Sequence, residues 1–204
     1  MKFLSILCAG VLALVSGAAS AAVVYDNGLP NTSNGYSIAG GNVTRDNFSL
    51  GTSADITGVT FYFQNYNGIT GWNQDISYQF SSDVGGSNIL ASGTGQNVTP
   101  TDSGLPWCCG GGNAWRVDFQ LESAFTAVAG TTYWLGLTGA TGASAAWWVT
   151  TNYVDGSNRG GVDFAFALND NLSISPVPLP AGMPLLIGAL GMAALVRRRR
   201  KTAA

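Results

Sequence analysis

The sequence predicts an all-β fold, namely a single antiparallel β-sandwich or jelly-roll domain over residues 22–176. Short runs of alternating apolar and polar residues recur along this segment, and Gly, Asn, Asp and Ser separate them. No stretch of it keeps a 3.6-residue apolar period for two turns, and 28 glycines in the chain disfavour long helices. About eight to ten short strands in one such segment are typical of two packed sheets.

The individual strands follow from apolar residues spaced two apart. We expect them at residues 56–63, 76–80, 115–121, 133–137, 145–150 and 164–168. The clearest alternation begins at Trp115, and it places Arg116, Asp118 and Gln120 on the face opposite the apolar side chains. The turn Ala129–Thr131 has the spacing of a hairpin, which predicts that the strands before and after it pair with each other.

The N-terminus has the three parts of a secretory signal peptide. Lys2 supplies a positive charge, residues 3–15 form an apolar run, and Ala19–Ala21 is a small-x-small cleavage signal. We therefore expect residues 1–21 to be a leader, cut after Ala21 or Ala22. Cys8 lies within the apolar run and is expected to leave with it.

The C-terminus predicts a membrane stop. Residues 179–196 carry no charge and would span about 27 Å as a helix, just enough for a bilayer core. Because proline is tolerated only in the first helical turn, the helix is expected to start near Pro184. Five cations follow the span: Arg197, Arg198, Arg199, Arg200 and Lys201. The positive-inside rule keeps them cytoplasmic and places residues 22–176 across the membrane. A buried core helix with a basic end is the alternative, but it should show a polar face and this segment has none.

Directly before and within this span lie Val177, Pro178, Leu179, Pro180 and Ala181. A short proline motif, an apolar segment and a terminal arginine cluster, in that order over residues 177–204, resemble the PEP-CTERM class of bacterial sorting signals, in the variant named for its VPLPA motif. The resemblance implies recognition by an exosortase-type membrane protease in a Gram-negative bacterium. It further implies removal of the tail, transfer of the body to the cell surface or extracellular matrix, and association with exopolysaccharide and biofilm. The motif departs from the commoner Pro-Glu-Pro form by lacking its glutamate.

A second resemblance lies in the body itself. Residues 46–50, 56–61 and 129–135 are similar to strand-and-turn segments of exported β-domains that bear this kind of tail. These segments imply a fold and transfer no functional residue.

The charge of the body differs from that of the whole chain. Residues 22–176 hold only Arg45, Arg116 and Arg159 as cations, together with all 11 acidic residues. Such an acidic body does not attract phosphate backbones or anionic lipid, which excludes nucleic acid as a partner.

The chain contains no histidine. This excludes Ser-His-Asp and Cys-His catalysis and His-ligated zinc. Two facing carboxylates of a glycosidase are the remaining acid-base route, but Glu122 is the sole glutamate and the aspartates are scattered. Asp155–Asn158 with Asp163 offers oxygen ligands for Ca²⁺, although it lacks the bidentate glutamate of an EF-hand loop and reads better as a turn. We expect no enzymatic activity, no cofactor and no metal.

Cys108 and Cys109 are the only cysteines outside the leader. Adjacent Cα atoms lie about 3.8 Å apart, below the separation of ordinary disulfides, so a bond between them closes a strained ring. The glycines that follow, residues 110–112, let the backbone adapt to it. We favour a vicinal disulfide that stiffens a loop; cross-links between chains and thiols that bind a soft metal are the alternatives.

Tryptophans provide the candidate ligand-binding surface. All six lie in the body: Trp72, Trp107, Trp115, Trp134, Trp147 and Trp148. Alternation favours a core position for Trp115. Trp147 and Trp148 are adjacent on a predicted strand and must point to opposite faces. Exposed rings of Trp107, Trp147 or Trp148 could stack on sugars, whereas filling of a sandwich core is the structural alternative.

Three hypotheses of function follow from the sequence. The first is a non-enzymatic surface or matrix protein with a structural or adhesive role. The second is a carbohydrate-binding module, and the third is a carboxylate-based glycosidase.

Overall fold

The computed structural model describes residues 22–65, 68–109, 112–139, 146–152 and 161–170. The predicted leader, the sorting motif and the span at 179–196 lie outside these residues. Within them no helix is long and apolar enough to cross a membrane. The strands of the described residues are β1 (Ala22–Asp26), β2 (Pro30–Ser37), β3 (Thr44–Ser49), β4 (Ala54–Gln64), β5 (Ser77–Ser81), β6 (Ile89–Thr94), β7 (Gln96–Pro106), β8 (Asn113–Ala127), β9 (Thr132–Thr138), β10 (Trp147–Thr151) and β11 (Phe166–Asp170).

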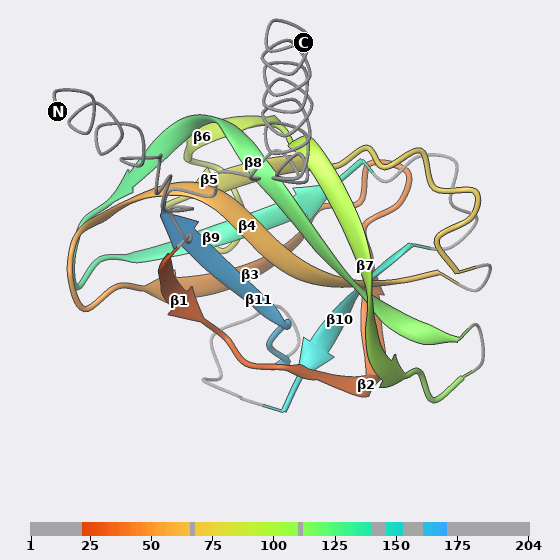
Figure 1. The fold of residues 1–204 in the computed structure, drawn as a ribbon. Coiled ribbons are helices and arrows are strands. Elements are labelled where there is room, and N and C mark those ends of the chain that lie inside the picture. Colours follow the sequence, from red (N-terminus) through yellow and green to blue (C-terminus); the bar gives the residue numbers. More distant parts are fainter. Residues whose placement is uncertain (1–21, 66–67, 110–111, 140–145, 153–160, 171–204) are drawn as a thin grey trace, which may run out of the picture. The chain divides into compact units, whose positions relative to one another are not determined.

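The strands form two antiparallel sheets, which confirms the predicted all-β, sandwich-like fold (Figure 1). In the seven-stranded sheet β7 pairs with β8, and β8 pairs with one edge of β4. The other edge of β4 is long enough to hold β11 and β10 one after the other, and these pair onward with β1 and β2. The four-stranded sheet has the order β3-β9-β5-β6.

Aromatic side chains from both sheets fill the space between them. Phe80 of β5 stacks on Phe125 of β8 with ring centroids 4.3 Å apart, and Tyr78 stacks on Phe119 at 6.0 Å. All four rings are buried. Since each fully buried side chain of this size contributes about 1.5–3 kcal/mol, these pairs fix how the sheets face each other.

The alternation predicted from Trp115 onward is present in β8. Val117, Phe119 and Leu121 are buried, while Trp115 is half-buried and packs against the core. The segments predicted as strands all contain strands, and the structure adds β1, β2, β3, β6 and β7.

The predicted hairpin at Ala129–Thr131 is wrong. The turn exists, with Gly130 at φ 70° and the amide of Thr131 donating to the carbonyl of Val128 at 3.2 Å. However, β9 pairs with β3 and β5 in the other sheet and not with β8. The buried side chains of β9 must face those of β8 across the core, so the turn carries the chain from one sheet to the other.

The first and last described strands lie side by side. In the register of β1 with β11, Ala22 is opposite Asp170. The amide of Ala22 also donates to the carboxylate of Asp170 at 3.1 Å. Both ends of the described domain therefore emerge at the same place in the seven-stranded sheet.

Candidate functional site

The two adjacent tryptophans of β10 have opposite environments. Trp148 is fully buried, with its ring 4.8 Å from that of Phe164, and its indole N–H donates to the carbonyl of Ala165 at 3.1 Å. The prediction that Trp148 could stack on a sugar is therefore wrong, because the alternation of the strand turns it into the core. Trp147 is half-buried on the other face, opposite Ser37 of β2.

Trp107 remains a candidate for stacking on a sugar, and it lies directly before the two cysteines. Its amide donates to the carbonyl of Gly112 at 3.0 Å, and its side chain is half-buried. A disulfide joins Cys108 and Cys109, whose Cα atoms are 3.8 Å apart, and both residues are exposed. This is the arrangement favoured from the sequence.

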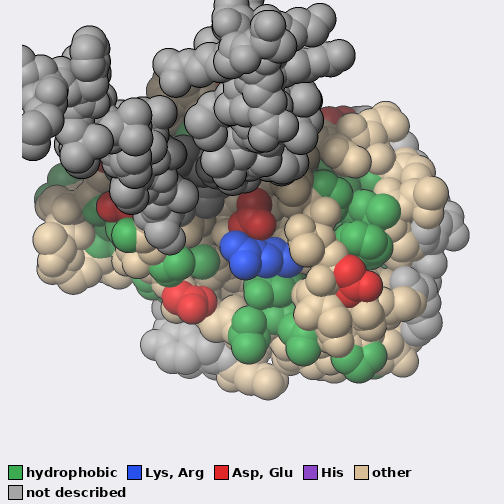
Figure 2. Space-filling view, viewed as in Figure 1, with side chains coloured by type: hydrophobic (Ala, Val, Ile, Leu, Met, Phe, Trp, Pro, Cys, Tyr) green, Lys and Arg blue, Asp and Glu red, His purple; other side chains and the backbone are tan. Residues whose placement is uncertain are grey.

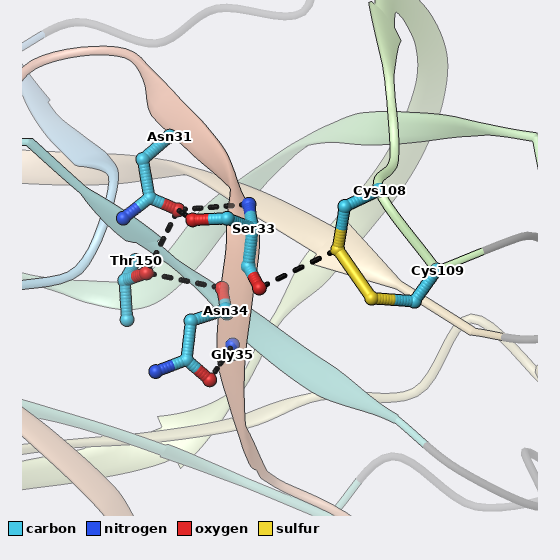
Figure 3. The surroundings of a disulfide bond; sticks show 7 residues. All are labelled: Asn31, Ser33, Asn34, Gly35, Cys108, Cys109 and Thr150. Carbon is cyan, nitrogen blue, oxygen red and sulfur yellow. Dashed lines mark hydrogen bonds between the residues drawn. A yellow bond between two sulfur atoms is a disulfide. The ribbon is translucent and has the colours of Figure 1, made fainter.

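The disulfide loop rests on β2. The amide of Cys108 donates to the carbonyl of Thr32 at 3.0 Å, and Cys108 Sγ lies 3.4 Å from the carbonyl oxygen of Ser33 (Figure 3). A disulfide sulfur carries no proton, so the second approach is a contact and not a donated hydrogen bond. We call residues 31–35 and 107–109 together the disulfide rim.

The polar sequence of β2 explains its irregular path along the rim. The side-chain oxygen of Asn31 accepts hydrogen bonds from the amide of Ser33 at 3.0 Å and from the hydroxyl of Thr150 at 3.0 Å (Figure 3). Thr32 between them has φ 59°, which is uncommon for a β-branched residue. At Gly35 a β-carbon would lie only 3.0 Å from that of Trp147, so a larger residue would push the tryptophan aside. The side chains of Asn31 and Thr150 thus hold β2 where the loop can reach it.

A pocket of about 490 Å³ opens at the junction of β2 and β3. Its walls combine aromatic rings with amide, hydroxyl and guanidinium side chains, from Tyr36, Ser37, Asn42, Val43, Thr44, Arg45 and Phe164. The ring of Tyr36 is 39% exposed and stands edge-on to Phe164 at 5.5 Å. The guanidinium of Arg45 donates to the side-chain oxygen of Gln79 at 2.9 Å. Pockets of a few hundred Å³ with an aromatic wall and few polar groups suit small polar ligands.

A buried carboxylate lies next to Phe164 but does not offer chemistry. Asp46 is 1% exposed, and one of its oxygens accepts hydrogen bonds from the amide of Phe164 at 2.6 Å and from the side chain of Asn27 at 3.0 Å. Asn27 also donates to the carbonyl of Phe164 at 2.9 Å. These bonds fix the chain between β10 and β11 to β1 and β3, which is a structural role.

The outer face of the seven-stranded sheet is polar. Arg116 and Asp118 form an ion pair of 2.9 Å. The pKa of Tyr62 is raised, mainly by burial and also by Asp26 and Asp118, while Arg116 opposes the shift. Figure 2 shows basic and acidic side chains next to each other on one face, with apolar side chains beside them. Side chains of both charge signs are typical of a solvated sheet face, whereas a site for a charged ligand needs a potential of one sign.

The oxygen ligands considered for Ca²⁺, and interpreted instead as a turn, divide between described and undescribed residues. Residues 155–158 lie outside the described residues, whereas Asp163 is 1% exposed and its carbonyl accepts from the amide of Thr151 at 2.8 Å. Across the ranges that the structure describes, no three His, Cys, Asp or Glu residues gather as metal ligands would.

Comparison of the chain with protein-family models, curated proteins and solved structures gives no match. The candidate sites therefore rest on their own geometry. Sequence reasoning missed Tyr36 and the other residues that line the pocket with it. The signal for it was an aromatic residue in a polar run, between Gly35 and Ser37, where an aromatic side chain is the exception.

Proposed function

We propose that the chain is an exported surface or matrix protein, in which a non-enzymatic β-domain is delivered by the leader and sorted through the C-terminal tail. In this proposal residues 179–196 form a transmembrane helix that holds the body on the periplasmic side. An exosortase-type enzyme then acts at the tail and passes the body to the cell surface or extracellular matrix. There the protein has a structural or adhesive role in exopolysaccharide or biofilm. For the domain itself we propose a jelly-roll connection of the strands.

The pairing of β1 with β11 is the observation that carries this proposal. The first and last described residues of the domain, Ala22 and Asp170, lie next to each other. The last strand is bonded along both edges, to β1 and to β4. A pull on the C-terminal end of the domain is therefore resisted by two neighbouring strands, as an adhesive domain attached through that end requires.

Deletion of residues 177–204 tests the anchoring. The truncated protein should appear in the soluble periplasmic or culture fraction, because the span and the cations are gone. A double substitution, Pro178→Ala with Pro180→Ala, is the matched control, since it alters the motif and keeps the apolar span. This control should stay in the inner membrane. A truncated protein that remains with the envelope would contradict the proposal.

Carbohydrate binding is the second candidate, and the pocket at Tyr36 favours it. An exposed aromatic ring beside amide and hydroxyl groups matches the two faces of a sugar, which has apolar C–H patches and a polar rim. Trp107 and Trp147 are half-buried and remain as additional stacking surfaces. A glycosidase is less favoured, because the buried Asp46 is already engaged by hydrogen bonds.

Binding of the full chain to exopolysaccharide from the producing bacterium tests this second candidate. Tyr36→Ala should weaken retention by about tenfold if the ring contributes roughly 1–2 kcal/mol of stacking. Tyr62→Ala, a half-buried tyrosine that does not line the pocket, should leave retention unchanged. If Tyr36→Ala is retained as well as Tyr62→Ala, the ring of Tyr36 does not contribute, and Trp107→Ala and Trp147→Ala are tested next. Retention that survives Tyr36→Ala, Trp107→Ala and Trp147→Ala would exclude binding through these aromatic residues.

A further inference from the structure

The disulfide of the rim is accessible to reagents in solution. Cys108 and Cys109 are both exposed, although a disulfide that only supports a fold is generally buried or shielded. Their adjacency also holds the Cα atoms 3.8 Å apart, below the range that disulfides prefer, and such bonds are reduced more readily. Exposure and ring closure together make this bond a substrate for thiols.

The two sulfur atoms are not equivalent. Cys108 is held against β2 by its amide, which donates to Thr32, and its sulfur lies 3.4 Å from the carbonyl oxygen of Ser33. Cys109 makes no hydrogen bond to the other residues that the structure describes. In Figure 3 Cys108 lies nearer to β2, with its sulfur toward Ser33, and Cys109 lies farther from the strand. An incoming thiolate therefore meets less obstruction at Cys109.

We propose that the Cys108–Cys109 bond is a site of thiol–disulfide exchange with an external dithiol, and that Cys109 is the sulfur attacked. One thiolate of the dithiol forms a bond to Cys109 Sγ. The bond between the two cysteines breaks, and its electron pair goes to Cys108 Sγ, which takes up a proton. The second thiol of the dithiol then attacks its own sulfur in the mixed disulfide, which releases Cys109 as a thiol. The dithiol is oxidised to a disulfide, and the protein gains two electrons and two protons.

The structure also suits Cys108 as the thiol that reduction leaves on β2. Once protonated, Cys108 has an S–H directed toward a carbonyl acceptor, so the contact with Ser33 becomes a weak hydrogen bond. The amide bond from Cys108 to Thr32 does not involve sulfur and persists. The reduced loop therefore stays on β2, with Cys109 as a free thiol at the surface. This inference rests on the rim alone and holds whether or not the tail is sorted as proposed.

The position of the first adduct tests the proposal. The oxidised full chain, carrying Cys8→Ser so that only the vicinal pair remains, is exposed to glutathione, quenched with acid and fragmented by mass spectrometry. Glutathione is a monothiol, so an early acid quench traps the mixed disulfide before a second thiolate resolves it. We expect the adduct on Cys109 in about tenfold excess over Cys108, given that the choice of attacked sulfur follows access. Dithiothreitol should then yield two thiols per chain without a change in the native fluorescence of the tryptophans.

Two variants keep the test independent of the stability of the adduct. Cys108→Ser leaves Cys109 alone, and Cys109→Ser leaves Cys108 alone, each in the Cys8→Ser chain. The thiol of Cys109 should be alkylated by iodoacetamide about tenfold faster than that of Cys108. Equal rates, an adduct mainly on Cys108, or resistance to dithiothreitol until the chain unfolds would each overturn the proposal.

Discussion

The inner face of the seven-stranded sheet and the disulfide rim differ in how their side chains are used. On the inner face Trp148 and Phe164 pack against each other. Asp46, which comes from β3 in the facing sheet, and Asn27, which follows β1, are engaged there by hydrogen bonds. On the rim the side chains are half-buried or exposed, and the backbone makes the main contact between the loop and β2. Both regions join segments far apart in the sequence.

The difference indicates where this protein can have chemistry. A group that already holds a buried strand in place cannot change partner without loss of fold, because an unsatisfied buried polar group costs about 1–3 kcal/mol. A group on the rim exchanges its contact for water at little cost. We therefore assign stability to the inner face and recognition or reactivity to the rim and to the neighbouring pocket at Tyr36.

The sharpest form of this comparison is a pair of substitutions at adjacent positions. Trp148→Ala should lower the free energy of unfolding by about 3–5 kcal/mol, since it empties a fully buried site against Phe164. Trp147→Ala removes the same ring from the outer face and should cost about 1 kcal/mol or less. Urea unfolding followed by circular dichroism measures both. Similar losses for the two variants would break the comparison.

The buried carboxylate gives the next effect in size. Asp46→Ala leaves the amide of Phe164 and the side chain of Asn27 without their acceptor in the core, and it should cost about 2–4 kcal/mol. Asp55→Ala is the matched control. Asp55 also lies in a strand and accepts a hydrogen bond, from Thr126 at 2.6 Å, but it is exposed. Its loss should stay below about 0.5 kcal/mol. A small effect at Asp46 would show that water or a neighbouring acceptor replaces its carboxylate.

The sequence predicted the inner face better than the rim, for a physical reason. Apolar residues spaced two apart mark a strand with one buried face, and β4, β8 and β9 carry this pattern. On the rim, the adjacent cysteines and the glycines after them did predict the loop of Cys108 and Cys109. Strands β2 and β7 are polar and were missed because neither buries an apolar face. Pro100 within β7 disguised it further, and is tolerated since β7 lies at the edge of the sheet.

Pairings between distant segments were beyond the sequence. The alternation around Asp46 places it on the same face as Phe48, which hinted at burial, but nothing local identified Phe164 as its partner. Likewise, whether β9 pairs with β8 or joins the other sheet after the turn at Gly130 depends on which strands face each other across the core. Alternation stated that one of Trp147 and Trp148 faces inward, and only the packing of β10 between β4 and β2 decided which.

The disulfide should contribute little to the stability of the domain. Cys108→Ser with Cys109→Ser removes a disulfide between adjacent residues. Because the loop that it closes is so short, it lowers the conformational entropy of the unfolded state only slightly. We expect a loss of about 1 kcal/mol or less in urea unfolding, well below that of Trp148→Ala. Trp107 lies beside the loop, and its fluorescence reports whether the loop stays on β2. A loss comparable with that of Asp46→Ala would place the rim among the structural regions.

The smallest expected effect is the pH dependence of a carboxylate next to the rim. Asp102 is exposed on β7, and its pKa is lowered below the usual 3.8 by the hydrogen bond from the amide of Gly104 and then by that from the side chain of Asn113. Because the folded-state pKa is the lower one, this interaction stabilises the protein above the unfolded-state pKa and is lost as the pH falls through the folded-state value. Asp102→Asn should therefore reduce the urea midpoint at neutral pH. The difference should shrink as the pH falls below 3.8 and vanish once it is below the lowered folded-state pKa of Asp102. Asn113→Ala, which removes only the second donor, should show a smaller difference with the same dependence. A difference that persists or grows in acid would mean that the interaction does not depend on the charge of Asp102.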